Sequence, residues 1–309
     1  MALRTIARII CWRKGDVNGN RFRNAEKHGI LRSMISAQKA PEKRKKRSKR
    51  PESMSSSQKC FQAMELMASE PYEIGLSELA ADLKLPFATA HRVVATLCES
   101  GVAEQDPATR RYRLTGKALW IGTGYLRRSS VYRTAFLELQ VMARRVQGLV
   151  HLATIESDKV LYLHTVGSPS AVYLYADTGE RRPMHCTGLG KAMLAYQPDE
   201  VVNRIVSKKL EKLTPKTITS AAAFREELAA IRKRGFALDD EENAPALRCV
   251  AAAIRDSSGK SVAAFSVSAP IAVLRDDVIP TVSDIIREAA MRVSSQLGFR
   301  GGSNFQSLF

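Results

Sequence analysis

The chain has 309 residues, of which 45% are hydrophobic and 26% are charged, an ordinary composition for a globular protein. This length exceeds that of one ordinary hydrophobic core and predicts two domains. The sequence has no run of about 18 uncharged apolar residues, and it does not begin with a typical secretory signal. We therefore expect a cytoplasmic protein without a membrane span.

Cysteine usage argues against two further classes of protein. The five cysteines, at positions 11, 60, 98, 186 and 249, are odd in number and widely spaced, and they form no CxxC pair. That pattern fits neither a disulfide framework nor a structural zinc site. We expect reduced thiols, no metal and no cofactor.

The formal net charge of +17 is concentrated at the start of the chain, where residues 1–53 hold 16 Lys/Arg and 4 Asp/Glu. The other 256 residues therefore carry a net charge of only +5. Low hydrophobicity and the run PEKRKKRSKRPES predict that residues 1–57 form a basic, disordered extension. It could add salt-sensitive contacts to DNA phosphates or serve only as a solvated extension. Met34 and Met54 are alternative translation starts.

Three short helices are predicted after this extension. The first covers residues 58–69, and the second covers 76–83 with Ser77 as its N-cap. The third runs over 86–99 and begins with Pro86, which suits the first turn of a helix. Its apolar side chains recur at helical spacing and form one stripe: Ala90, Val93, Val94 and Leu97.

The segment VAEQDPATRRYRL, at 102–114, alternates around the turn at Asp106-Pro107 and predicts a two-stranded hairpin. Three helices followed by a hairpin with an arginine tip are typical of a winged helix-turn-helix, here over residues 58–116. Short helix pairs are common, so the spacing alone also allows a small helical bundle. Residues 117–148 read as helical with weak breaks at Gly122 and Gly124, and 117–130 suits a linker helix.

The pattern changes after residue 148. Strand-like runs VHLATI, VLYLHTV and AVYLYA are followed by predicted helices at 188–196, 198–207 and 221–234, strands at 247–255 and 262–268, and a last helix at 276–297. Strands flanked by helices at both ends predict an antiparallel-rich α+β domain. We place this domain at 131–299, with a flexible tail at 300–309.

Several segments together carry a family resemblance. GLSELAADLKLPFATAHRVVATLCESGVAEQDPATRRYRLTGKAL resembles the DNA-binding module of the IclR family of bacterial transcriptional regulators. RRPMHCTGLGKAMLAY and RGFALDDEENAPALRCVAAAIRDSSGKSVAAFSVSAP are similar to that family's effector domain. The resemblance covers roughly residues 58–298 and implies a mixed α/β chain with a winged helix-turn-helix, a linker helix and a C-terminal α+β (GAF-like) effector-binding domain.

The same resemblance implies a function. We expect a ligand-responsive regulator of a catabolic operon that binds a double-stranded DNA operator and a small-molecule carboxylate effector. Proteins of this type are homodimers or dimers of dimers that read palindromic sites. Whether the protein represses or activates cannot be read from its residues.

Sequence readout needs side chains at the start of the recognition helix and at the wing tip. The candidates are Phe87, Ala88, Thr89, His91, Arg92, Arg110 and Arg111. Family members usually show Lys-Ser-Thr where this chain has Phe-Ala-Thr, so no operator sequence can be carried over. Phe87 could instead pack under the turn, His91 could be an ordinary surface histidine, and the wing arginines could be merely solvated.

An effector pocket is implied where Thr187 precedes a helix that opens with a glycine pair, because such a start offers backbone N–H groups to an anion. The resemblance to the family's effector pocket implies the candidate residues: Gly188 and Leu189 as backbone donors, with Asp239, Cys249, Ser266 and Ser268 as side-chain ligands. Ser266 and Ser268 share one face of a predicted strand. Alternatively, the serines bond each other, Cys249 is a core residue, Asp239 caps a turn, and Glu242 belongs to a solvated face.

The apolar wall of the pocket is expected to include Leu152, Leu163, Tyr173 or Met184. Three alanines depart from the family pattern around the pocket. Ala246 and Ala269 stand where glycine is usual, and Ala253 stands where proline is frequent.

Two other functions stay open. His151, His164 or His185 could join Asp239 and Cys249 in a nucleophilic enzyme site, although the sequence has no nucleophile elbow, P-loop or HExxH motif. We expect no catalytic residues. The basic extension would also suit an architectural DNA binder that senses nothing, but such a protein would have no use for the α+β domain.

Overall fold

A computed structural model describes residues 54–69, 73–167 and 178–301. Residues 1–53 of the predicted basic extension, the strand-like run AVYLYA and most of the predicted tail lie outside these ranges. The predicted end of the extension at residue 57 was wrong, because Ser55 caps a helix that begins at Ser56. Within them, no helix combines the length and the apolarity that crossing a bilayer requires.

The first helices are α2 (Ser56–Met67), α3 (Leu76–Asp82) and α4 (Phe87–Glu99). The predicted N-cap of α3 was wrong, because the helix begins after Gly75 and Ser77 lies inside its first turn. The backbone N–H of Gly75 donates to Oε2 of Glu78 at 3.1 Å, which satisfies one of the free donors at the helix start. One hydrophobic core joins these helices: Ala63, Met67, Leu79, Ala90, Val93, Val94, Leu97 and Tyr112.

The predicted hairpin is confirmed as antiparallel strands β1 (Ala103–Gln105) and β2 (Tyr112–Leu114). Ile74, just before α3, pairs with Tyr112, and each residue donates its backbone N–H to the other's carbonyl at 2.9 Å. The wing is therefore bonded through its backbone to the segment that leads into α3.

Two helices follow the wing, α5 (Gly116–Arg128) and α6 (Ser130–Arg145). The predicted breaks at Gly122 and Gly124 were wrong, because both glycines lie within α5. The break is at Ser129, whose backbone is extended and whose hydroxyl accepts the N–H of Tyr132 at 3.1 Å. A serine that caps the next helix interrupts the helix more effectively than an interior glycine does.

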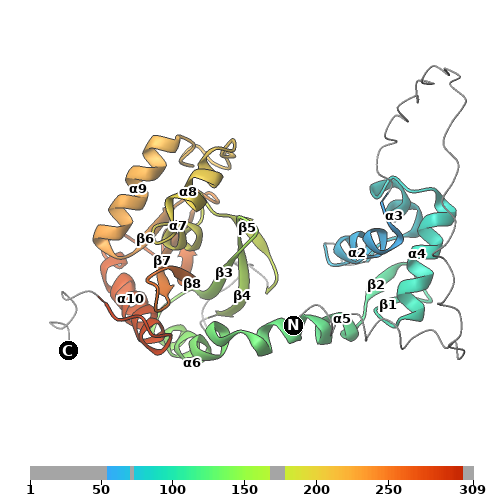
Figure 1. Cartoon of the computed structure of the whole chain (residues 1–309), viewed down its shortest axis with the longest axis horizontal. Helices are drawn as coiled ribbons and strands as arrows, with labels where there is room; N and C mark the ends of the chain where they lie inside the picture. The colour runs from blue at the N-terminus through green and yellow to red at the C-terminus, as the bar shows by residue number, and fades with distance from the viewer. Residues whose placement is uncertain (1–53, 70–72, 168–177, 302–309) are drawn as a thin grey trace, which may run out of the picture. The chain divides into compact units, whose positions relative to one another are not determined.

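The C-terminal region is built on one six-stranded antiparallel sheet in the order β5-β4-β3-β8-β7-β6, which confirms the antiparallel α+β prediction. Figure 1 shows this sheet with helices packed around it. The short strands β5 and β6 were not predicted. The bounds are β3 Leu149–Glu156, β4 Lys159–Gly167, β5 Arg181–Pro183, β6 Ala237–Asp240, β7 Leu247–Arg255 and β8 Ser261–Pro270.

Helices cover both faces of this sheet. α6 and α10 (Ile279–Gln296) pack on one face, and their hydrophobic core includes Leu139, Phe265 and Ile286. α7 (Gly188–Leu194), α8 (Asp199–Val206) and α9 (Ala221–Arg234) pack on the other. Leu152 and Leu163 lie in the core of the α6/α10 face, whereas Met184 lies on the α7 face. The two leucines were therefore assigned to the wrong side of the sheet, and Tyr173 lies outside the described residues.

Close backbone approaches fix the position of α7. A Cβ at Gly190 would lie only 2.2 Å from the carbonyl oxygen of Met184, so no larger residue fits there without a shift of the backbone. A Cβ at Gly188 would lie 3.3 Å from the carbonyl oxygen of Cys249. The start of α7 thus lies directly on β7.

Candidate functional site

The start of α4 presents most of the predicted DNA-reading side chains outward. Phe87 is 57% exposed, so it does not pack under the turn. Ala88, His91 and Arg92 are also exposed, and Thr89 is half-buried. This face can enter a groove of DNA because the opposite stripe of α4 is buried in the core.

The two predicted wing arginines have different surroundings. Arg110 is exposed in a left-handed conformation with φ of 59°, and its guanidinium contacts no partner among the described residues. Arg111 instead forms an ion pair of 2.6 Å with Glu78 and donates to the carbonyl of Glu73 at 3.1 Å. Arg113 likewise pairs with Glu104 at 2.8 Å. In this conformation Arg110 is available for a phosphate, while Arg111 and Arg113 are engaged within the protein.

The predicted effector residues come together on the sheet face beneath α7. Asp239 on β6 pairs in register with Cys249 on β7, and Cys249 pairs with Ser268 on β8. The Ser268 hydroxyl donates to the Cys249 sulfur at 3.0 Å. Gly188 and Leu189 are buried at the start of α7 above this row. The six predicted residues therefore share one side of the sheet.

Ser266 lies in the neighbouring row of the same face, beside residues that the sequence analysis did not assign to the effector site. Across the strands, Ser266 is opposite His151, and His151 is opposite Thr165. Nδ1 of His151 lies 2.9 Å from the Thr165 hydroxyl. Burial lowers the pKa of His151 to about 4, so this histidine is neutral at physiological pH. Ser266, His151 and Thr165 are adjacent because β3 lies between β4 and β8 in the sheet.

Asp239 is buried, and its carboxyl group lies beside the Cys249 thiol, whose pKa it helps to raise. Oδ1 accepts the backbone N–H groups of Glu242 at 2.8 Å and Asn243 at 3.2 Å, so the residue does cap a turn. Oδ2 has no hydrogen-bond partner among the described residues. Burial raises the pKa of Asp239 to about 7, although the nearby Lys191 charge acts in the opposite direction.

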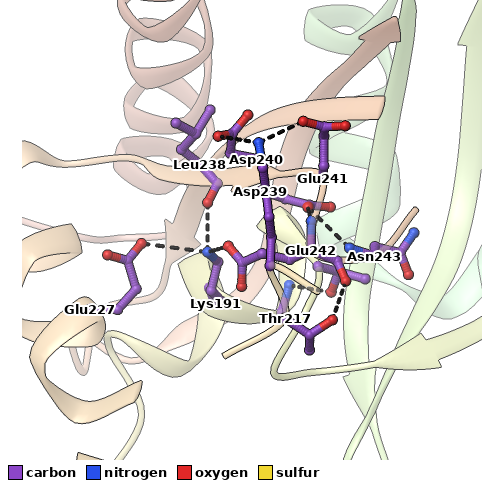
Figure 2. A network of polar contacts seen from close by, with 12 residues as sticks. Lys191, Thr217, Glu227, Leu238, Asp239, Asp240, Glu241, Glu242 and Asn243 are labelled. Atoms are coloured by element: carbon purple, nitrogen blue, oxygen red, sulfur yellow. Dashed lines mark hydrogen bonds and ion pairs between the residues drawn. The ribbon is translucent and has the colours of Figure 1, made fainter. Parts of the chain in front are cut away.

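A buried lysine holds the loop after β6 against α7. The Lys191 ammonium, whose side chain is 1% exposed, donates to the carbonyl of Leu238 at 2.6 Å and to the Glu242 carboxylate. Glu227 on α9 lies 3.5 Å away (Figure 2) and also pairs with Arg234 at 2.6 Å. Glu242, predicted to be solvated, is buried because Lys191 compensates its charge. The sequence around Lys191, GLGK, does not indicate that this lysine is buried or that it pairs with Glu242.

Unsatisfied polar atoms mark this side of the sheet. Buried side-chain oxygens without a hydrogen-bond partner in the described chain occur on Asp239, Glu242, Asn243 and Ser266. Buried polar atoms in proteins almost always form hydrogen bonds, so a group of unsatisfied atoms indicates that water or a ligand binds there. On the α6/α10 face, by contrast, the buried hydroxyls of Ser283 and Ser294 donate to carbonyls within α10.

One departure from the family pattern has a visible cost. Ala246 adopts φ of 59°, a left-handed conformation that favours glycine. Its backbone is nonetheless bonded on both sides, to Glu241 at 2.9 Å and to Ile271 at 3.0 Å. Ala253 and Ala269 lie in the extended strands β7 and β8, where alanine meets no such strain.

The geometry gives no support to a Cys-His nucleophile. Burial raises the pKa of Cys249 well above its ordinary value, so the thiol keeps its proton. His164 packs against Tyr132 and Phe136 of α6, and His185 bonds the carbonyl of Glu211 at 2.8 Å. In the described part of the chain, no histidine forms a hydrogen bond with Cys249.

Comparisons with known proteins place both regions. Residues 56–107 match the IclR helix-turn-helix domain, and residues 123–295 match the bacterial transcriptional regulator IclR C-terminal domain. The chain is 34% identical over 220 residues to the HTH-type transcriptional regulator BhcR of Paracoccus denitrificans, covering 71% of this chain and 79% of the relative. It is 29% identical to KdgR of Escherichia coli, covering 81% and 95%.

A solved structure extends the comparison. The crystal structure of an IclR homolog complexed with 4-hydroxybenzoate, from Microbacterium hydrocarbonoxydans, superposes with a TM-score of 0.70 and 26% identity. The match covers 79% of this chain and 99% of the homolog. Both the linear order and the fold are thus shared over nearly the whole length of that protein.

Proposed function

The chain belongs to the IclR family of bacterial transcriptional regulators, and from this membership we propose that it controls a catabolic operon in response to a small organic acid. It combines an N-terminal helix-turn-helix DNA-binding domain with a C-terminal effector-binding domain. The relatives named above are regulators of transcription rather than enzymes. We place its action in the bacterial cytoplasm, where the chromosome lies.

The observation that carries the effector proposal is the group of buried polar atoms beneath α7 that have no hydrogen-bond partner among the described residues. The Ser266 hydroxyl could donate to a ligand carboxylate, and so could the Asp239 carboxyl group when it holds a proton. A ligand hydroxyl could donate to the Asn243 oxygen. We propose that Gly188 and Leu189 add backbone donors and that Cys249 and Ser268 complete the site. The 4-hydroxybenzoate bound by the Microbacterium homolog carries both a carboxylate and a hydroxyl.

The effector proposal is tested by a thermal-shift screen of the full chain against carboxylate metabolites, including 4-hydroxybenzoate. A ligand that binds only the native state adds about 2.7 kcal/mol to stability at a hundredfold excess over its Kd. Ser266→Ala should weaken that stabilisation, while Ser283→Ala, on the opposite face of the sheet, should leave it unchanged. If every metabolite fails, or if both variants respond alike, the effector site lies elsewhere.

We propose that Phe87, Ala88, Thr89, His91 and Arg92 meet the major groove and that Arg110 meets the backbone or minor groove beside it. Support comes from the exposure of this face of α4 and from the unpaired guanidinium of Arg110. Arg111, the other predicted wing arginine, lies next to Arg110 in the chain, but its guanidinium is bonded to Glu78 and to the Glu73 carbonyl. The domain boundaries proposed are 58–116, 117–130 and 131–299.

We propose that the protein works as a homodimer or a dimer of dimers. α5 has no buried residue, and it exposes four large apolar side chains: Leu119, Trp120, Ile121 and Tyr125. A helix of this kind is stable in water when a second copy covers it. Trp120→Glu should therefore shift the sedimentation coefficient toward that of the monomer, whereas Lys117→Glu on the same helix should not.

A further inference from the structure

The Glu78 carboxylate joins two parts of the DNA-binding region. Oε2 accepts the backbone N–H of Gly75 at 3.1 Å, which closes the first turn of α3. The same carboxylate accepts hydrogen bonds from both terminal nitrogens of the Arg111 guanidinium: Nη1 donates to Oε1 at 3.1 Å, and Nη2 donates to Oε2 at 2.6 Å. A two-pronged contact of this kind fixes direction as well as distance. Glu78 therefore ties the wing to the start of the first helix of the helix-turn-helix pair.

Arg111 is held from a second side as well. Its Nη2 donates to the Glu73 carbonyl at 3.1 Å, and the adjacent Tyr112 exchanges two backbone hydrogen bonds with Ile74. Side-chain and backbone contacts thus join the same two segments of the chain. An isolated exposed ion pair contributes little, but one that reinforces a backbone bridge restricts how the wing can turn.

The wing tip itself is a closed unit that must move with Arg111. The backbone N–H of Asp106 donates to the Arg111 carbonyl at 2.8 Å, and the N–H of Arg110 donates to the Asp106 carbonyl at 2.9 Å. The side chain of Gln105 donates to the Arg110 carbonyl at 2.9 Å. Fixing Arg111 therefore fixes Arg110, the neighbouring guanidinium that is free to meet DNA.

We propose that Glu78 and Arg111 form a latch that positions the wing, so that Arg111 aims Arg110 at the DNA backbone instead of binding DNA itself. This inference rests on the proposed contact of α4 and the wing with DNA. It revises the sequence-based expectation that both wing-tip arginines are DNA contacts. Glu78, an acidic residue beside a DNA-binding surface, then supports binding despite its charge.

The sign of one substitution separates the latch from simple electrostatics. Glu78→Gln removes a negative charge and keeps an acceptor for the Gly75 N–H, because glutamine also serves in capping boxes. If Arg111 were a DNA contact restrained by Glu78, this variant would free it and tighten binding. The latch predicts about three- to tenfold weaker binding instead. The matched control is Glu65→Gln, an exposed carboxylate on α2, which should bind as well as the wild type or slightly better.

Binding is measured on a duplex selected from a random pool by the wild-type full chain, and on a scrambled duplex. The latch predicts that Glu78→Gln, Arg111→Gln and the double variant weaken binding to the selected duplex to a similar extent. It also predicts that the dependence of affinity on salt falls to the same extent in all three variants, because each of them loses the phosphate contact of Arg110. Tighter binding by Glu78→Gln, additive losses, or a salt slope that is lowered in Arg111→Gln but unchanged in Glu78→Gln would overturn the latch.

A second measurement needs no DNA. Amide hydrogen exchange over residues 106–112 should accelerate in Glu78→Gln and in Arg111→Gln, but not in Glu65→Gln. Unchanged exchange in both latch variants would overturn the inference even if binding fell. If the wild type selected no duplex, the proposed DNA contact would fail, while the exchange data would still decide whether the latch exists.

Discussion

The wing and the effector region each contain an arginine or lysine paired with glutamate, but in opposite surroundings. The Arg111–Glu78 pair is open to solvent, with its side chains 33% and 53% exposed, whereas Lys191 and Glu242 are 1% and 8% exposed. An exposed ion pair is weak because water and salt screen its charges. In a buried site each charge must be balanced within the protein, because water no longer solvates it. The Arg111–Glu78 pair can therefore orient the wing at little cost in stability. The Lys191–Glu242 pair instead holds the loop after β6 against α7.

Breaking the buried network should have the largest effect. Lys191→Met leaves Glu242 buried without its cation and should lower the free energy of unfolding by about 3–5 kcal/mol. Urea denaturation followed by circular dichroism measures the change. Lys212→Met, an exposed lysine in the same region, is the control and should change stability by less than about 0.5 kcal/mol. If both variants lost less than about 0.5 kcal/mol of unfolding free energy, the buried Lys191–Glu242 pair would be no more important for stability than an exposed charge.

The pH dependence of stability gives the next effect. The pKa of Asp239 is about 7 in the fold, against an ordinary value near 3.8, so the folded state binds the extra proton between these values. This contribution to stability is complete below pH 4 and is lost as the pH rises through 7, a decline of a few kcal/mol. His151, with a pKa lowered to about 4, contributes the opposite slope between pH 4 and 6.5.

Asp239→Asn isolates the first of these slopes. Its urea midpoint should fall less than that of the wild type between pH 5 and pH 8, because the asparagine does not titrate. Asp284→Asn, an exposed carboxylate on α10, should keep the wild-type pH profile. A profile for Asp239→Asn that parallels the wild type would show that Asp239 is ionised throughout.

Replacing the exposed Arg92 should affect DNA binding and not stability, the reverse of what is expected for the buried Lys191. Arg92→Ala should leave stability within about 0.5 kcal/mol of the wild type and weaken binding to a selected duplex by about 1–3 kcal/mol. Electrophoretic mobility shift at fixed salt measures the binding. Lys59→Ala on α2 serves as the control for lost charge. Unchanged affinity and footprint for Arg92→Ala would show that α4 does not read the groove.

The smallest effect concerns the loop that carries Glu242. Ala246→Gly relieves the left-handed strain and should raise the free energy of unfolding by about 0.5–1 kcal/mol, the strain relief being partly offset by chain entropy. Ala253→Gly, in the extended strand β7, should lower it by a similar amount. A loss of stability in both variants would mean that the loop tolerates alanine without strain.

The sequence predicted elements well where local signals agreed. α9 has the predicted bounds because Ser220 caps its start and Gly235 ends it in a left-handed conformation. β5 and β6 were missed because three or four residues are too few for an alternating pattern. Because β6 is so short, the sequence also did not indicate that Asp239 is a strand residue paired with Cys249.

The candidate effector site was predicted only in part. The resemblance supplied Asp239, Cys249, Ser266 and Ser268, and the strand register brings them together. His151 was not assigned to the effector site because its position opposite Ser266 depends on β3 lying next to β8, a pairing between segments far apart in the sequence. Glu242 was misplaced because the DDEE run reads as solvated, and nothing in the sequence shows that Lys191 is buried.

The central pairing of the sheet has a consequence for how the chain is made. β3 lies between β4 and β8, and its Thr154 hydroxyl bonds the carbonyl of Val262, 108 positions later. On the ribosome, the inner edge of β3 stays open until the last strand emerges, whereas the α2–β2 core needs nothing beyond residue 114. Translation should therefore release a folded DNA-binding module well before a sensor exists to govern it.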